Sequence, residues 1–364
     1  MLPIWMFEET SRPQTAAKKR FLLLDLLRGL AALVVVLSHM DGVTSQIFSS
    51  GYLAVDFFFV LSGFVLAQAY GEQRLDMASF LKIRLIRLYP LYIVGTIFGV
   101  LVIAQLRSDP RTYLPLIFNI FFLPSPDAGP NGNSGFAALF PFNMPAWSLF
   151  FELAVNIVWF AMLPLLTTRR LVVLCICAAI FRIVGHLTSG AFGMHDFWSA
   201  LWTGTSRTPY CFFVGVAIFR VWRSGVFPIK APIWLIVVLS LTIFALPPYP
   251  LLHALEILLL LPALVLLAAN IDPPKALVSA CALLGSLSYA IYAIHYPILV
   301  AFNYAATGLA WPSGWQYIMA FGQHEWGLAP LEVLTVLGLG FLLDRYFDTP
   351  LRRRLARRVQ SQMT

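Results

Sequence analysis

The chain has 364 residues, a net charge of +8, 59% hydrophobic residues and only 12% charged residues. Soluble domains carry about 25% charged residues, so this composition excludes a soluble globular protein. Apolar runs of about twenty residues recur, whereas the strands of a membrane β-barrel would be shorter and would alternate with polar residues. We therefore expect an all-α, polytopic membrane protein.

The apolar runs predict a bundle of about ten transmembrane helices. Residues 1–20 are expected to form a cytoplasmic N-terminal tail, 21–347 the transmembrane domain and 348–364 a basic cytoplasmic C-terminal tail. The segment 113–123 is apolar but too short to span, so we predict a re-entrant or interfacial hairpin there. The predicted spans are 21–40, 52–70, 88–106, 145–166, 171–188, 208–222, 232–248, 252–270, 277–302 and 328–347.

The basic residues set the expected orientation. With the N-terminus inside, nearly all Lys and Arg in the connections lie on the inner side, and they do not mark a nucleic-acid surface. The outer side receives only Arg107, Arg111 and Arg207. This asymmetry predicts a bacterial inner membrane protein with both termini in the cytoplasm.

The first predicted span carries three ionisable residues, Asp25, Arg28 and His39. Charge inside a spanning helix is unfavourable and usually marks a functional site. Arg28 and His39 are eleven residues apart, which is about three helical turns and roughly 16 Å along the axis. The two side chains are therefore expected on one face, with Asp25 one turn before Arg28 and able to pair with it.

The second span places Asp56 one turn from its outer end, where it is either solvated at the interface or part of a site. Arg84 and Arg87 precede the third span and share a helical face. Ordinary positive-inside charge or lipid binding explains this pair, and so does a clamp for phosphate groups.

Two later spans carry polar side chains at helical spacing. In 145–166, Trp147 suits an aromatic belt, while Ser148 and Glu152 share a face and Glu152 lies about two turns inside. In 277–302, the segment S-L-S-Y-A-I-Y-A-I-H-Y-P places Ser288 and His295 on one face. His295 suits either a structural role or a functional one in the outer half of the membrane.

These pieces together resemble acyltransferase family 3, a family of multi-span membrane enzymes that transfer acyl groups to carbohydrates and related acceptors. The resemblance rests on the Arg28-to-His39 spacing, the segment G-Y-L-A-V-D-F-F-F-V-L-S-G-F, the Arg84/Arg87 pair followed by Tyr-Pro, W-S-L-F-F-E, and the segment ending at His295. It implies a cytoplasmic acyl-CoA donor, acetyl-CoA in the first instance, and an acceptor presented at the outer side. It also implies that Arg28 and His39 are central to the chemistry.

We expect Arg84, Arg87 and Arg28 to bind the CoA phosphates at the inner face, and Asp25, the partner of Arg28, to belong to the same cofactor site. His39 is expected to act as general base, oriented by Glu152 or Asp56. Direct transfer and an acyl-His39 intermediate both remain open, no metal is expected, and the oligomeric state is undetermined. The residues expected to contact the acceptor are Trp147, Ser148, Ser288, Tyr289 and His295.

A different class of protein shares some of these features. Buried Asp, Arg, His and Glu side chains are also typical of the charge relays in transporters and flippases. The sequence shows no internal repeat, and many transporters are built from inverted repeats. A membrane transporter of a glycan or small anionic metabolite is therefore the alternative function, and a membrane sensor or assembly subunit is a third.

Overall fold

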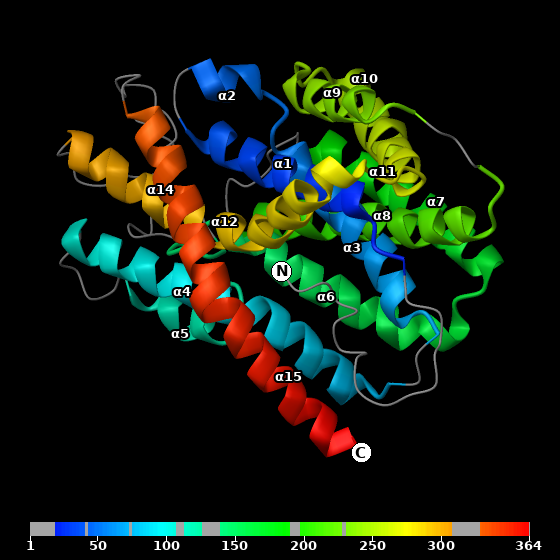
Figure 1. The fold of residues 1–364 in the computed structure, drawn as a ribbon, viewed down its shortest axis with the longest axis horizontal. Helices are drawn as coiled ribbons and strands as arrows, with labels where there is room; N and C mark the ends of the chain where they lie inside the picture. The colour runs from blue at the N-terminus through cyan, green and yellow to red at the C-terminus, as the bar shows by residue number, and fades with distance from the viewer. Residues whose placement is uncertain are drawn as a thin grey trace.

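The computed structural model describes residues 19–40, 43–72, 75–106, 113–125, 139–189, 197–227, 231–307 and 328–363. Throughout these residues the regular structure is helical (Figure 1), which agrees with the predicted all-α class. The elements are α1 (Leu22–His39), α2 (Val43–Ile47), α3 (Leu53–Tyr70), α4 (Met77–Leu106), α5 (Pro115–Ile120), α6 (Ala146–Met162), η3 (Leu163–Leu165), α7 (Thr168–Ser189), α8 (Phe197–Arg223), α9 (Ile233–Ala245), α10 (Pro250–Leu255), η4 (Glu256–Leu260), α11 (Leu261–Ala269), α12 (Lys275–Thr307), α14 (Ala329–Leu342), η6 (Leu343–Asp348) and α15 (Thr349–Met363).

Seven stretches of helix in the described part of the chain are long and apolar enough to cross a membrane. Each of the ten predicted segments lies on a helix, but the 27-residue α8 is not among the seven, and α9 has only 13 residues and α14 only 14. Helices of this length fall short of the roughly twenty residues that a bilayer requires. The predicted count of about ten spans is therefore not established by the helices themselves.

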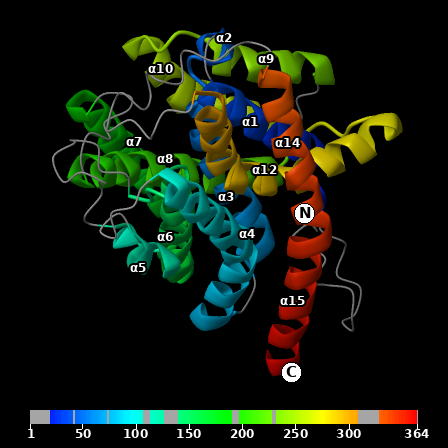
Figure 2. The same cartoon turned by 90° about the vertical axis from the view of Figure 1, so that its left-hand side faces the viewer.

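Helix α3 lies in the centre of the bundle, whereas α7 lies at its edge (Figures 1 and 2). In the apolar stretch of α3, 78% of the residues are buried, compared with only 22% in that of α7. A helix that is apolar on all sides suits either a protein core or lipid. The exposed apolar side chains of α7 therefore form a lipid-facing surface, which includes Val172, Val173, Ile176, Ile180 and Leu187.

Two helices begin earlier than predicted. Helix α4 starts at Met77 rather than 88, and α8 starts at Phe197 rather than 208, so Arg84, Arg87 and Arg207 all lie inside helices. Helix α8 continues through Pro209, which membrane helices tolerate where neighbouring groups satisfy the freed backbone. Asp76 caps the start of α4 by accepting hydrogen bonds from the backbone and hydroxyl of Ser79, and these bonds hold the Asp76 pKa below its usual value.

The segment predicted as a hairpin contains the six-residue helix α5, which is too short to span. The hydroxyl of Tyr92 on α4 donates to the carbonyl of Asn119 at 2.6 Å, and the hydroxyl of Tyr89 donates to that of Ile120 at 2.7 Å. These bonds hold α5 against α4. Most of the loop that follows, 126–138, lies outside the described residues.

Glycines bring two helix pairs into close contact. A Cβ on Gly63 of α3 would lie 1.9 Å from the carbonyl oxygen of Phe212, and one on Gly215 of α8 would lie 2.1 Å from that of Val60. Gly29 of α1 packs against α12, and Gly285 of α12 packs against α1, and neither position has room for a Cβ. Small residues allow membrane helices to approach closely, and these two crossings position the polar groups described next.

Candidate functional site

Helices α1 and α12 lie side by side through the middle of the bundle (Figure 1), and they bring two histidines together. The rings of His39 and His295 meet edge to face, with centroids 5.1 Å apart. His39 is exposed, whereas His295 is completely buried behind it. The sequence predicted both residues in the outer half but did not predict their contact.

Backbone carbonyls orient both imidazole rings. Nδ1 of His39 lies 2.8 Å from the carbonyl oxygen of Val35, and Nδ1 of His295 lies 2.8 Å from that of Tyr292. A carbonyl only accepts, so Nδ1 carries the proton in each ring and the neutral imidazole keeps its lone pair on Nε2. The exposed His39 therefore presents a basic nitrogen to an approaching hydroxyl group.

Arg28 faces the same helix as His39. Its Nε donates to the Ser288 hydroxyl at 3.1 Å, and its Nη2 donates to the Gly285 carbonyl and to Asp25, both at 2.8 Å. Arg28 and His39 thus lie on the same side of α1, as their spacing predicted, and Asp25 pairs with Arg28 as expected. Ser288 contacts this arginine rather than the histidine pair.

The Glu152 carboxylate does not orient His39, contrary to one of the two predictions. It accepts hydrogen bonds from Arg84 at 2.7 Å and from the Ser62 hydroxyl at 2.9 Å. The prediction was wrong about this contact because it estimated depth from α6 alone. The packing of α3, α4 and α6 instead brings Glu152 to Arg84.

Arg87 of α4 lies near the same charged groups. Its electrostatic neighbours include the guanidinium groups of Arg84, Arg28 and Arg352, and the carboxylate of Glu152. The structure therefore gathers the three arginines that the sequence proposed for phosphate binding. It adds Arg352 of α15, which the sequence placed in the tail.

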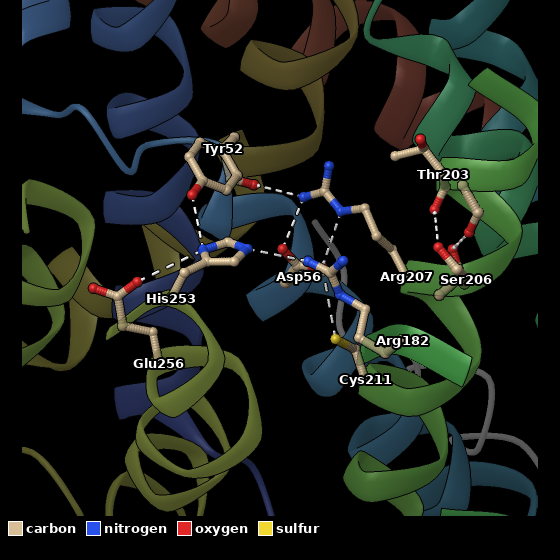
Figure 3. Close-up of polar contacts among 11 residues, drawn as sticks. Tyr52, Asp56, Arg182, Thr203, Ser206, Arg207, Cys211, His253 and Glu256 are labelled. Carbon is tan, nitrogen blue, oxygen red and sulfur yellow. Dashed lines mark hydrogen bonds and ion pairs between the residues drawn. The ribbon is translucent and has the colours of Figure 1, made fainter. Parts of the chain in front are cut away.

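Asp56 likewise has an arginine as its partner rather than His39. It is completely buried and pairs with Arg207 of α8 through bonds of 2.7 Å and 3.2 Å, while the Cys211 thiol lies 3.7 Å away (Figure 3). The ring of Trp147 lies 5.3 Å from the Arg207 guanidinium carbon. A buried carboxylate requires such a pair. Arg207, predicted in an outer connection, instead lies inside α8 and supplies the cation.

A second buried cluster of polar side chains lies next to the Asp56–Arg207 pair. The ring of His253 on α10 lies 2.8 Å from the Tyr52 hydroxyl and 3.2 Å from Arg182, with the Glu256 carboxylate 3.8 Å from its Nδ1 (Figure 3). His253, Arg182 and Glu256 were not among the site residues predicted from the sequence. Their signal was available, since each is an ionisable residue within an apolar run.

The remaining predicted residues join α6 and α4 to α12. The Ser148 hydroxyl lies 2.6 Å from the Tyr292 hydroxyl, and both bond to the carbonyl of Pro145. The Tyr289 hydroxyl donates to the Leu88 carbonyl of α4. Ser148 and Tyr289 therefore hold the walls of the site together.

The site offers different chemistry at its two ends. One end carries the accessible imidazole of His39, and the other end carries several guanidinium groups, which suit phosphate. Among the described residues, no three or more His, Cys, Asp and Glu side chains gather as a metal site would require. The arginines are groups that suit an anionic cofactor.

Comparison with known proteins identifies the family. A family model described as an acyltransferase domain matches residues 21–345. A protein described as protein 2 in picA locus, from Rhizobium radiobacter, is 42% identical over 161 residues, which cover 39% of this chain and 81% of that protein. The acyltransferase MdmB of Streptomyces mycarofaciens is 25% identical over 334 residues, covering 85% of this chain and 82% of that protein.

The O-acetyltransferase OatA of Staphylococcus aureus is 22% identical over 374 residues, covering 91% of this chain but only 57% of that protein. The chain thus spans little more than half the length of this relative. No solved structure matches the chain. The family model covers nearly all of the transmembrane bundle, including both helices that carry the histidines, and the chain therefore belongs to the acyltransferase family.

Proposed function

We propose that the protein is an integral membrane O-acyltransferase that moves an acyl group, acetyl in the first instance, from cytoplasmic acyl-CoA to a hydroxyl group of a carbohydrate or glycoconjugate at the outer side. The main support for this proposal is that one face of α1 carries a candidate functional residue near each of its ends. Arg28 lies with the inner arginines and His39 lies beside His295. The family membership and the O-acetyltransferase relative support the same reaction class.

The donor would bind by its phosphates to Arg87 and Arg28 at the inner end, beside Arg84, whose guanidinium pairs with Glu152. A guanidinium fork matches phosphate oxygens better than an ammonium group does. The separation of Arg28 and His39 along α1 is roughly 16 Å by helix rise, about the length of an extended pantetheine arm. This length supports delivery of the thioester to the imidazole.

The chemistry then follows from the tautomer of His39. Its Nε2 takes the proton of the acceptor hydroxyl while the hydroxyl oxygen attacks the thioester carbonyl carbon. The carbon–sulfur bond breaks, the acyl–oxygen bond forms, and the leaving thiolate takes the proton from the Nε2 of the His39 imidazolium, which gives free CoA and the neutral imidazole. The backbone bond from Nδ1 to Val35 holds the ring in place, and the ring of His295 packs against its edge.

The proposed location is a bacterial cytoplasmic membrane, with both termini inside. The excess of Lys and Arg in the inner connections supports this orientation. We propose an acceptor-binding role for Trp147 at the outer side, since an aromatic ring suits a sugar and the ring is only partly buried.

The test uses the purified full-length protein in proteoliposomes supplied with acetyl-labelled acetyl-CoA and a panel of carbohydrate acceptors. We expect labelled ester on the acceptor when donor and acceptor are on opposite sides of the membrane. Exchange of the acceptor across the membrane without ester formation would instead support the transporter alternative. Neither ester nor exchange with any acceptor would contradict the proposed reaction.

A further inference from the structure

A cluster of polar side chains around His253 has no part in the chemistry proposed for His39. Arg182 on α7, Tyr52 at the start of α3 and Glu256 all approach the His253 ring (Figure 3). Glu256 is the first residue of η4, a π-helical turn, and such turns are rare and often occur at functional sites. These residues are called the His253 cluster below.

The ring of His253 is neutral in this arrangement. An arginine only donates hydrogen bonds, and Nη2 of Arg182 lies 3.2 Å from Nε2 of His253, so this nitrogen accepts and the ring proton lies on Nδ1. Nδ1 lies 2.8 Å from the Tyr52 hydroxyl and 3.8 Å from the Glu256 carboxylate. The longer distance exceeds that of a hydrogen bond, and a neutral ring does not balance the charge of a carboxylate.

Two members of the cluster lack the hydrogen bonds that burial requires. Glu256 is completely buried, and neither of its carboxylate oxygens has a hydrogen-bond partner. Arg182 is 3% exposed, and its Nε has none. The nearby Asp56 carboxylate is paired with Arg207 rather than with Arg182 (Figure 3). Buried polar groups without partners are unfavourable and rare, so the cluster offers acceptors at Glu256 and a donor at Arg182 to a ligand.

The chemistry of these groups indicates the class of ligand. A hydroxyl group both donates and accepts, so neighbouring hydroxyls of a sugar would donate to Glu256 and accept from Arg182. Aromatic rings, which suit the apolar faces of a sugar, lie next to the cluster. The half-buried rings of Tyr52 and Trp147 have their centroids 5.8 Å and 5.3 Å from the guanidinium carbon of Arg207. A carbohydrate therefore fits the cluster.

The cluster adjoins the end of the site that carries His39. Tyr52 follows Gly51, where a Cβ would lie 2.6 Å from the Cβ of Ser38, the residue before His39. The start of α3 is therefore packed against the end of α1. A sugar bound by the cluster would have its other hydroxyls on the side of the proposed base.

We propose that the His253 cluster is a subsite for the carbohydrate acceptor, in which Glu256 accepts and Arg182 donates hydrogen bonds to hydroxyl groups that do not react. This inference rests on the proposed transfer to a carbohydrate, and it names residues that bind the acceptor. His253 is a positioning residue that holds the Arg182 guanidinium. The alternative is a structural role, in which the cluster only joins α7 and α10 to α3.

The experiment measures sugar binding by the full-length protein in nanodiscs. The probes are the methyl glycosides of glucose, galactose, mannose and rhamnose, detected by saturation-transfer difference NMR, and the affinity for acetyl-CoA is measured on the same samples. We expect the wild type to bind at least one glycoside. Glu256→Gln and Arg182→Lys should each weaken that binding about tenfold, because a charge-assisted hydrogen bond is lost. Both should bind acetyl-CoA within twofold of the wild type.

The matched control is Glu332→Gln, the same substitution at a buried carboxylate of α14, which should leave both affinities unchanged. A second measurement needs no variant of the cluster. Among deoxy analogues of the bound glycoside, at least one should bind the wild type about tenfold more weakly, because the cluster loses a hydroxyl partner.

Three results would overturn the subsite. These are wild-type protein that binds none of the glycosides, unchanged glycoside binding in both cluster variants or with every deoxy analogue, and an equal loss of glycoside and acetyl-CoA binding in the variants, which indicates a structural role. A wild type that binds a glycoside but not acetyl-CoA would instead overturn the proposed donor and leave the subsite in place.

Discussion

At the scale of single residues, the histidine pair allows the base to be tested directly. His39 is exposed and its Nε2 is free to accept a proton, while Nδ1 is committed to Val35. His39→Gln keeps a polar side chain of similar size but removes the base, so acyl transfer should fall by about 10²- to 10⁴-fold. The affinity for acetyl-CoA should remain unchanged, since His39 lies away from the arginines. Transfer at the wild-type rate by a correctly inserted variant would show that another group is the base.

The two arginines of α4 should differ in what their loss does. Arg84 is 3% exposed and bonded to Glu152, so Arg84→Ala leaves a carboxylate inside the bundle without its cation. Removal of one partner of a buried pair destabilises by about 3–5 kcal/mol, and Arg84→Ala should lower the unfolding temperature in detergent. The double variant Arg84→Met with Glu152→Gln should recover part of that loss. Arg87→Ala should instead weaken acetyl-CoA binding, and equal unfolding temperatures for Arg84→Ala and wild type would contradict this division.

At the scale of helices, the crossing of α3 and α8 positions the Asp56–Arg207 pair. Gly63 and Gly215 lie at the contact, about two turns from Asp56 and Arg207 respectively, and a Cβ on Gly63 would lie 1.9 Å from a backbone oxygen. Gly63→Ala must therefore push the helices apart, because backbone cannot give way as a flexible side chain can. We expect a lower unfolding temperature and lower acyl transfer.

The matched control for this prediction is Gly338→Ala in α14. A Cβ on Gly338 meets no atom within 4 Å, so alanine should be neutral or slightly stabilising in that helix. Similar unfolding temperatures for the two variants, both measured in the same detergent, would show that the α3–α8 crossing tolerates separation.

At the scale of the whole molecule, the positive-inside distribution predicts which surfaces face the cytoplasm. Gln46 in α2 and Ser224 after α8 are both exposed and lie in connections expected on opposite sides. After replacement of the four native cysteines, a membrane-impermeant maleimide should label Gln46→Cys in intact cells and Ser224→Cys only after permeabilisation. The reverse pattern would invert the proposed orientation, and with it the sides assigned to donor and acceptor.

The sequence by itself determined the all-α membrane class, because uninterrupted apolar runs leave a chain few other structures. It also placed Arg28 and His39 on one face of α1, because helical periodicity depends only on residue spacing. The motifs further indicated the family that the family model confirms. The elements that it placed least well were α4 and α8, whose polar first turns resemble connections.

Only the tertiary structure decided which charged groups meet. Asp56 and Glu152 each had His39 as a plausible partner by depth, yet each pairs with an arginine from another helix. Helix packing likewise brings Arg207 and Arg182 close to Asp56, and Arg352 close to Arg87. Periodicity fixes the direction of a side chain from its own helix but not the rotation, tilt and neighbours of that helix. The rotation, tilt and neighbours of a helix depend on close packing at small residues such as Gly63 and Gly29. This packing joins segments far apart in the sequence, so only the tertiary structure shows it.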